Sequence, residues 1–456
     1  MKEGILMFGF ERVVKGTAFT SKSIQDVSIL EDNLFCLSKE GMIEQVISPK
    51  EESYKKVLTH YQETNKFQEL AQDEYLLPGF IDLHVHAPQW PQSGLALDKP
   101  LYDWLNTYTF PLEAKYSNID FAERVYTDLV DNLLSLGTTT VLYFGTIHKE
   151  ANLKLAEICA AKGQRGLVGK VVMDDKEQNP DFYRDETTEK ALEETEKFIE
   201  EVKEMSKQTK QGVYPVVTPR FIPSCTDEGL EGLGALAHKH DVHIQSHCSE
   251  SDWAHQFVLD RFGESDTASL NKFGLLTEKS VMAHCGFLSE ADATLFRETG
   301  TAVAHCPISN AYFGNAVTRV KQLLHDYQVD VGLGTDISGG FSPSLYDNIK
   351  QAVMSSRMLN DGVNNEITSE KRGIKESNIT LNEAFYLATA GGGQSLSLPI
   401  GKLEEGFAWD VQVVSSKHLP IFEEELLEET FQKLIYLMKP EQIREVWVQD
   451  QLVYKQ

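Results

Sequence analysis

The 456-residue sequence lacks any run of roughly 18 apolar residues, so no membrane-spanning helix is expected. Its first residues, MKEGILMFGFERVV, hold only a short apolar stretch and no small-residue cleavage site, so we expect no secretory signal peptide. Positive charge is also scarce, because 43 Lys and Arg residues stand against 69 Asp and Glu, for a net charge of −26. Such a surface repels a phosphate backbone, which argues against nucleic acid as a partner and leaves a small neutral or cationic substrate.

Cysteine is sparse, and no two cysteines form a Cys-x-x-Cys pair. The six cysteines are Cys36, Cys159, Cys225, Cys248, Cys285 and Cys306. Scattered thiols of this kind are typical of the reducing cytoplasm rather than of a disulfide framework, so we predict a cytoplasmic protein. The absence of a Pro-Cys-x-x-Cys signature also excludes the class of zinc deaminases built around that motif.

From residue 76 onward, eight short apolar runs alternate with segments of helical spacing. The runs are GFIDLHVH, TTTVLYFGT, RGLVGKVVM, VYPVVTPRF, VHIQSHCSE, SVMAHCG, TAVAHCP and DVGLGTD. They are nearly continuous in apolar residues, as strands buried on both faces are. Eightfold strand–helix alternation predicts an α/β fold of the (β/α)8 TIM-barrel type. The alternative is a doubly wound open sheet, which the lack of a glycine-rich fingerprint after the first run disfavours.

The two ends of the chain differ from this central region. Residues 1–75, 401–415 and 444–454 contain short strand-like pieces separated by turn residues. We therefore predict a small β-sandwich domain built from residues 1–75 and 396–456, the latter with a closing helix, around a barrel of residues 76–395. The charge-dense segment 185–211 is predicted to be a long exposed helix whose charges face solvent.

The ends of the predicted strands carry the side chains that point to chemistry. His84 and His86 are two residues apart, so they share one face of a strand, which in a barrel is the interior. Four later runs end in His247, His284, His305 and Asp336. Buried imidazoles and carboxylates are costly unless they are hydrogen-bonded in the core or bind a metal. Because five predicted strands each end in a histidine or an aspartate, these side chains should meet at the same end of the barrel, and we predict a metal site there. Imidazole and carboxylate donors favour zinc or ferrous iron.

Glu250 lies three residues past His247, on a loop above the predicted barrel pore. A carboxylate there can exchange a proton with a water whose pKa a divalent ion lowers toward roughly 7. Asp336 can hold both the ion and that water, and His284 can orient the water or stabilise an oxyanion. Together these residues predict hydrolytic attack on an electrophilic carbon.

The same residues resemble a known group of enzymes. The PGFIDLHVH stretch, the histidines of the fifth and sixth runs and the aspartate of the eighth resemble the amidohydrolase superfamily, and the His-x-x-Glu after the fifth run is similar to its deaminase and chlorohydrolase branch. Between residues 76 and about 395, seven stretches are similar to one family of that branch, whose members deaminate guanine. These stretches are HVHAPQW, WLNTYTFP, YFGTIH, TPRF, HIQSHCSE, HCPISN and GLGTDISGG.

The resemblance implies one zinc ion per chain, with Fe²⁺ as the alternative, held by His84, His86, His247 and Asp336. It implies that Glu250 shuttles the proton and that His284 and Asp336 activate the water. Binuclear members of the superfamily bridge two metals with a carboxylated lysine from the fourth strand. Here that run ends in VVTPRF, and Arg220 cannot be carboxylated in this way, so a single metal is expected.

The resemblance also implies that the substrate is guanine, converted with water to xanthine and ammonia, and that the protein is a homodimer. Gln89, Arg220 and Phe221 would contact the purine, together with His247, Glu250, His284 and Asp336. A guanidinium fork and an amide suit the mixed polar edge of a flat ring. The alternatives are a loop cap for Gln89, an ion pair for Arg220 and simple packing for Phe221.

Two other functions are compatible with this pattern. One is another aminohydrolase of the same branch, acting on a cytosine, adenosine-like or triazine ring. The other is a barrel that has lost catalysis and serves as a binding scaffold, although such a protein should lack some ligands, and here the full set is present.

Overall fold

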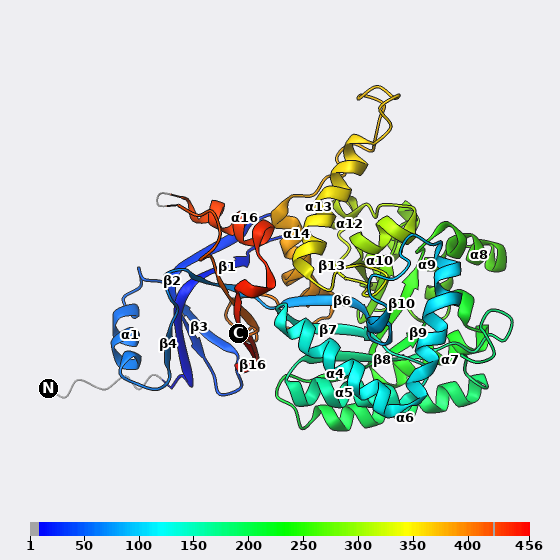
Figure 1. Ribbon diagram of the computed structural model, residues 1–456, viewed down its shortest axis with the longest axis horizontal. Coiled ribbons are helices and arrows are strands. Elements are labelled where there is room, and N and C mark those ends of the chain that lie inside the picture. Colours follow the sequence, from blue (N-terminus) through cyan, green and yellow to red (C-terminus); the bar gives the residue numbers. More distant parts are fainter. Residues whose placement is uncertain (1–8, 423–424) are drawn as a thin grey trace.

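A computed structural model describes residues 9–422 and 425–456. Figure 1 shows a barrel surrounded by helices beside a smaller, strand-rich domain, with the C-terminus between the two. Among the described residues, no helix is both long enough and apolar enough to cross a membrane.

The barrel contains the eight strands predicted from the sequence. They are β6 (Phe80–His86), β7 (Thr138–Phe144), β8 (Arg165–Val172), β9 (Val213–Pro219), β10 (His243–Cys248), β11 (Ser280–His284), β12 (Ala302–His305) and β13 (Val331–Leu333). All neighbours are parallel and follow strict chain order from β6 to β13. This order confirms the barrel, because a doubly wound sheet reverses its strand order.

The first and last strands meet at the carboxyl end of the barrel. The backbone N–H of Asp336 donates to the carbonyl of His84 at 2.8 Å, and the N–H of His86 donates to the carbonyl of Ile337 at 2.9 Å. A bridge between Val85 and Ile337 accompanies these bonds. The residues that follow β13 therefore nearly close the sheet, and they do so beside the two histidines of β6.

Helices cover the outside of the barrel. They are α4 (Ile119–Ser135), α5 (Lys149–Lys162), α6 (Thr188–Ser206), α7 (Asp227–His240), α8 (Asp252–Phe262), α9 (Asp266–Lys272), α10 (Glu290–Thr299), α12 (Val320–His325), α13 (Leu345–Asp361), α14 (Leu381–Ala388) and α15 (Ala390–Ser395). Helix α6 is the predicted charge-rich helix, and its apolar stripe of Phe198, Ile199 and Val202 is buried. Helix α13 and the loop 362–378 after it extend away from the barrel (Figure 1).

Several short helical segments follow the carboxyl ends of the strands and shape the mouth of the barrel. After β6 come η1 (Ala87–Gln92), α2 (Leu101–Trp104), η2 (Leu105–Thr109), α3 (Phe110–Glu113) and η3 (Ala114–Ser117); η4 (Ile222–Ser224) follows β9; and α11 (Pro307–Ser309) and η5 (Asn310–Gly314) follow β12. Segments η2 and η5 are π-helical turns, a form that is frequent at functional sites.

The small domain combines both ends of the chain, as predicted. Its strands are β1 (Arg12–Ser21), β2 (Val27–Leu37), β3 (Ile43–Ile47), β4 (Phe67–Glu69), β5 (Glu74–Pro78), β14 (Val411–Ser415), β15 (Ile443–Val448) and β16 (Gln451–Lys455), with helices α1 (Tyr54–Gln62), α16 (Leu427–Leu437) and η6 (Pro440–Gln442). The strands form one continuous mixed sheet in which β1 pairs with β2, β4 and β5. Side chains from the N-terminal strands β2 and β5 and from the C-terminal strand β14, including Phe35, Leu76 and Val411, share one apolar core.

Candidate active site

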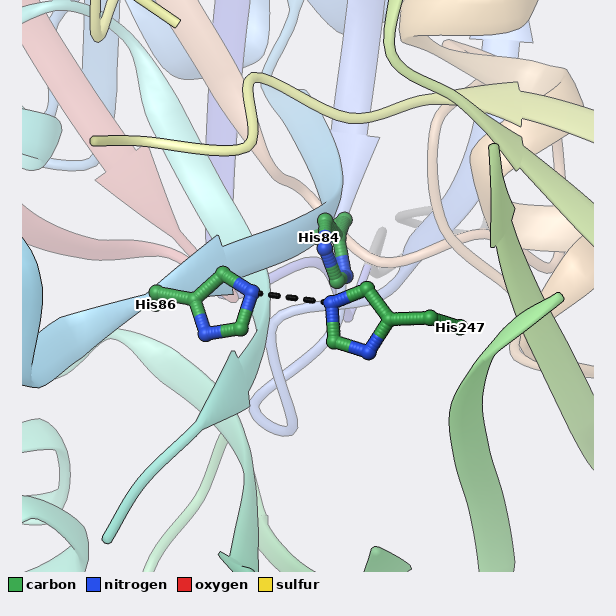
Figure 2. Close-up of side chains that lie close together, drawn as sticks. All are labelled: His84, His86 and His247. Carbon is green, nitrogen blue, oxygen red and sulfur yellow. Dashed lines mark hydrogen bonds between the residues drawn. The ribbon is translucent and has the colours of Figure 1, made fainter. Parts of the chain in front are cut away.

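Three histidines from two barrel strands point toward one another at the carboxyl end of the barrel (Figure 2). His84 and His86 end β6, and His247 lies near the end of β10. One ring nitrogen of each lies within 4.8 Å of the others, and the Nε2 atoms of His86 and His247 are 3.0 Å apart. All three side chains are buried. The alternation of side chains along β6 therefore places the two rings as the sequence predicts.

Asp336 adds a carboxylate to the three imidazoles. Its Oδ1 atom lies 3.1 Å from Nε2 of His84 and 3.5 Å from Nε2 of His86. Burial would raise the pKa of this carboxyl, but the neighbouring histidines, His84 first, hold the pKa of Asp336 well below its usual range. Burial in turn lowers the pKa of His86 and of His247 well below the ordinary value. These shifts favour neutral rings at His86 and His247 and an ionised carboxylate at Asp336, which are the protonation states that bind a metal.

The buried nitrogens of this cluster indicate what it can hold. Nε2 of His284 is buried and has no hydrogen-bond partner among the described residues, and Nε2 of His84, although 3.1 Å from Oδ1 of Asp336, lacks the geometry of a hydrogen bond. A buried polar atom without a partner is costly, and a divalent cation between imidazole nitrogens and a carboxylate oxygen would remove that cost. The residues present therefore fit one divalent metal ion, as expected from the sequence.

Hydrogen bonds behind the cluster fix the orientation of the rings. Nδ1 of His247 contacts the carbonyl oxygen of Arg220 at 2.5 Å, which directs Nε2 toward the other histidines. Nδ1 of His284 lies 2.9 Å from Oδ1 of Asn310, and this contact turns Nε2 of His284 toward the site. Asp82, which the sequence analysis did not identify, accepts hydrogen bonds from the backbone N–H of His84 and of Thr335.

Glu250 and His284 lie beside the same cluster, and one ligand atom of each is within 4.8 Å of the other and of His247. Nε2 of His284 is 3.6 Å from Oε1 of Glu250 and 3.9 Å from Oδ2 of Asp336. Burial raises the pKa of Glu250, although His284 partly offsets the effect. A raised pKa brings the titration of this carboxyl closer to neutral pH than that of an exposed glutamate, which suits a group that must both accept and release a proton.

Three of these strand ends turn through left-handed backbone conformations. Residues with positive φ include Ser249 at 47°, His284 at 71° and Asp336 at 50°. Non-glycine residues rarely adopt this region, and when they do they cluster at functional sites, where the surrounding structure holds them. The sharp turns redirect the chain immediately after each barrel strand, so the polar side chains converge instead of following the strand direction.

One cavity connects this cluster with the predicted recognition residues. Its lining includes Gln89, Arg220 and Phe221, and also His86, His247, Glu250 and Asp336. Phe221 is 9 % exposed and makes an edge contact with the His247 ring at 6.3 Å between centroids. His284 contacts the cluster without lining the cavity. The structure therefore brings the predicted recognition residues to the same space as the histidines.

Apolar side chains also line the cavity. They come from α2, η2 and η5: Leu101, Trp104, Leu105 and Phe313. The rings of Trp104 and Phe313 are 5.2 Å apart. Aromatic walls of this kind suit a flat ring. His305, by contrast, lines a separate cavity of about 750 Å³, and burial lowers the pKa of His305 to about 3.

Glu113 is the second residue that the sequence analysis did not identify. It ends α3, is fully buried and accepts hydrogen bonds from Arg220, with Nη1 to Oε2 at 2.6 Å and Nη2 to Oε1 at 3.2 Å. Its Oε1 atom also accepts from Nε2 of Gln89 at 3.0 Å. Arg220 thus forms the ion pair that was the alternative interpretation from sequence, and it also lines the cavity, while its contact with a purine stays a prediction.

Comparison with known proteins agrees with this geometry. Residues 75–453 match the model of the amidohydrolase family. A guanine deaminase from Mus musculus is 39% identical over 449 residues, covering 96% of this chain and 95% of that protein, and one from Dictyostelium discoideum is 38% identical over 443 residues, covering 93% and 94%. The crystal structure of guanine deaminase from C. acetobutylicum with guanine bound in its active site superposes with a TM-score of 0.87 at 31% identity, covering 97% of this chain and all of that one.

Proposed function

Since this chain belongs to the amidohydrolase family, we propose that it is a guanine deaminase, which hydrolyses guanine to xanthine and ammonia. The observation that carries the proposal is the single cavity that joins two sets of side chains. One set, His86, His247 and Asp336, has the donor atoms of a metal site, and the other, Gln89 and Arg220, has the planar polar groups that match a purine edge.

We further propose that the metal is zinc, held by His84, His86, His247 and Asp336. These four side chains offer neutral imidazole nitrogen and ionised carboxylate oxygen, the donor types that zinc prefers. When bound, such an ion lowers the pKa of a coordinated water and so supplies a hydroxide-like nucleophile near neutral pH. Fe²⁺ would accept the same donors.

The remaining polar groups of the site would orient the water and move its proton. Asp336 is ionised and can accept a hydrogen bond from the attacking water, while His284, held by Asn310, faces the same point. Glu250 would take the proton that the water loses as its oxygen adds to the ring carbon bearing the amino group. It would then deliver a proton to the amino nitrogen, so that the carbon–nitrogen bond breaks and ammonia leaves.

The substrate would lie with its ring between the aromatic walls of the cavity. Phe221, Trp104 and Phe313 supply apolar surface, and Arg220 can donate only, so it suits a carbonyl or bare ring nitrogen. This combination favours guanine over an adenosine-like ring, because guanine offers an N–H beside a carbonyl on one edge and an adenine ring has no carbonyl. The complete ligand and shuttle set also argues against a binding scaffold that has lost catalysis.

A direct assay tests the proposal. Purified protein should contain about one zinc per chain and form xanthine and ammonia in equal amounts from guanine, with little ammonia from adenine, cytosine or ammeline. Removal of the metal by a chelator should abolish turnover, and added zinc should restore it. Activity confined to one of the other three rings, or protein that neither holds nor responds to metal, would overturn the proposal.

We also propose that the protein is a cytoplasmic homodimer. The six cysteines are all unpaired, as in proteins of a reducing compartment. Helix α13 and the loop after it carry exposed apolar side chains that a second copy could cover: Met354, Met358, Val363 and Ile367. Light scattering coupled to size-exclusion chromatography tests the oligomeric state, and a mass of one chain would refute the dimer.

A further inference from the structure

We propose that Glu113 is a positioning residue that sets which purine edge the cavity accepts. By fixing the side chains of Gln89 and Arg220, it would make the site present one hydrogen-bond acceptor and one group of donors. That arrangement selects a ring edge with an N–H beside a carbonyl and rejects an edge with a bare nitrogen beside an amine. The inference rests on the proposed function, since it concerns how the same site recognises guanine.

Glu113 is placed to act on both recognition residues without touching the substrate. Its side chain is fully buried at the end of α3 and does not line the cavity. Arg220 donates to both of its oxygens, at 2.6 and 3.2 Å, and Gln89 donates to Oε1 at 3.0 Å. One carboxylate therefore joins residues that follow β6 and β9, strands that are not neighbours in the barrel.

The carboxylate determines which end of the Gln89 amide faces the cavity. Both oxygens of Glu113 accept from Arg220, and as the carboxylate of an ion pair Glu113 can only accept, so the Gln89 NH2 group is the end that faces it. The carbonyl oxygen Oε1 is then the free end of the amide, and no side chain or backbone group in residues 9–422 or 425–456 donates to it. The backbone of Gln89 is held as well, because its carbonyl accepts from Oγ of Ser338 at 2.9 Å.

Arg220 is fixed in a similar way. Its guanidinium lies over the Phe110 ring at 5.1 Å, and Nη1 contacts the sulfur of Met173 at 3.8 Å in addition to Glu113. The group can only donate, so the cavity meets N–H groups from Arg220 and a carbonyl oxygen from Gln89. Guanine has the complementary edge, with a ring N–H as donor and a carbonyl as acceptor.

2,6-Diaminopurine tests this interpretation because it exchanges the hydrogen-bond donor and acceptor of the recognised edge and keeps the amino group that the reaction removes. It carries the same 2-amino group as guanine, but its ring nitrogen is bare and its 6-substituent is an amine. The wild type should therefore use it far less well than guanine. In Glu113→Gln, the new amide can both donate and accept, so Gln89 can rotate its amide and Arg220 loses its ionic partner.

We expect Glu113→Gln to lower kcat/KM for guanine by about 10- to 100-fold, mostly through KM, because a buried guanidinium is left poorly paired. The ratio of kcat/KM for guanine to that for 2,6-diaminopurine should fall by at least about tenfold, since the orientation of Gln89 is no longer fixed. Glu113→Asp keeps an acceptor-only carboxylate, so it should retain most of this ratio even where KM rises. Ammonia release and chromatographic identification of the product supply the readout.

Asp410→Asn is the matched control, because Asp410 is another buried carboxylate that pairs with an arginine, Arg165, far from the cavity. It should lower the melting temperature and leave the ratio unchanged. An unchanged ratio in folded Glu113→Gln would overturn the inference, while a wild type inactive on guanine would overturn the proposed function instead. If Glu113→Gln does not fold, Gln89→Met removes the same acceptor, and a wild-type ratio in that variant would equally refute the proposal.

Discussion

Replacing Glu250 with glutamine separates proton transfer from every other property of the site. The two side chains have the same shape, but the amide cannot take up and return a proton. Within the described residues Glu250 makes no side-chain hydrogen bond, and its Oε1 lies 3.6 Å from Nε2 of His284. Because burial raises the pKa of Glu250, neutralising it removes an unfavourable buried charge rather than a stabilising pair.

The expected loss follows from the size of general acid–base catalysis. A positioned proton-transfer group contributes about 10²- to 10⁴-fold, which corresponds to roughly 3 to 5 kcal/mol in activation free energy. The free energy of unfolding should change by less than about 0.5 kcal/mol, since no hydrogen bond is lost. The metal content should remain that of the wild type, because the three histidines of Figure 2 and Asp336 are untouched.

Three measurements on the same preparation test this reasoning. Steady-state ammonia release from guanine gives kcat and KM, elemental analysis gives the metal per chain, and a thermal melt gives the stability. We expect a kcat at least about 100-fold lower with KM, metal content and melting temperature close to wild type. A kcat within tenfold of the wild type would refute the role of Glu250 as the shuttle. A loss of metal alongside activity would instead make Glu250 a ligand.

Three further variants test other parts of the structure. His84→Ala should lose metal and activity together, because two remaining imidazoles and one carboxylate hold an ion poorly; full metal occupancy by elemental analysis would show that the ligand set is wrong. Arg220→Lys should raise KM for guanine about 10- to 100-fold, because an ammonium cannot pair with both oxygens of Glu113 and still donate to the guanine ring. Unchanged kinetics would show that Arg220 has only a structural role. The hydrogen bond to Asp266 raises the pKa of His255 in the folded protein. The stability that this bond contributes should be complete below about pH 6.5 and should be lost as the pH rises through the pKa of His255 in the folded state. The melting temperatures of wild type and His255→Asn should therefore differ more at pH 6 than at pH 9, and an equal difference at both would contradict this.

The small domain and the mouth of the barrel show where local patterns are insufficient. The sequence predicted that both ends of the chain form one β domain, but not that β1 pairs with three other strands, since pairing partners depend on contacts between distant residues. Gln89 and Arg220 were named from the family resemblance, as residues that follow two of the strands. The interaction that ties them together was not, because Glu113 lies in a short irregular helical segment without a regular apolar period.

The sequence by itself determined the barrel and the inward direction of its paired histidines, because both depend on short-range periodicity. Apolar runs of strand length recur eight times, and side chains two residues apart on a strand must share a face, so His84 and His86 had to point inward together. Only the tertiary structure decided how the recognition residues are held. The carboxylate of Glu113 reaches Arg220 across 107 positions of the chain, and no local pattern encodes a contact that exists only once β6 and β9 are in the same barrel.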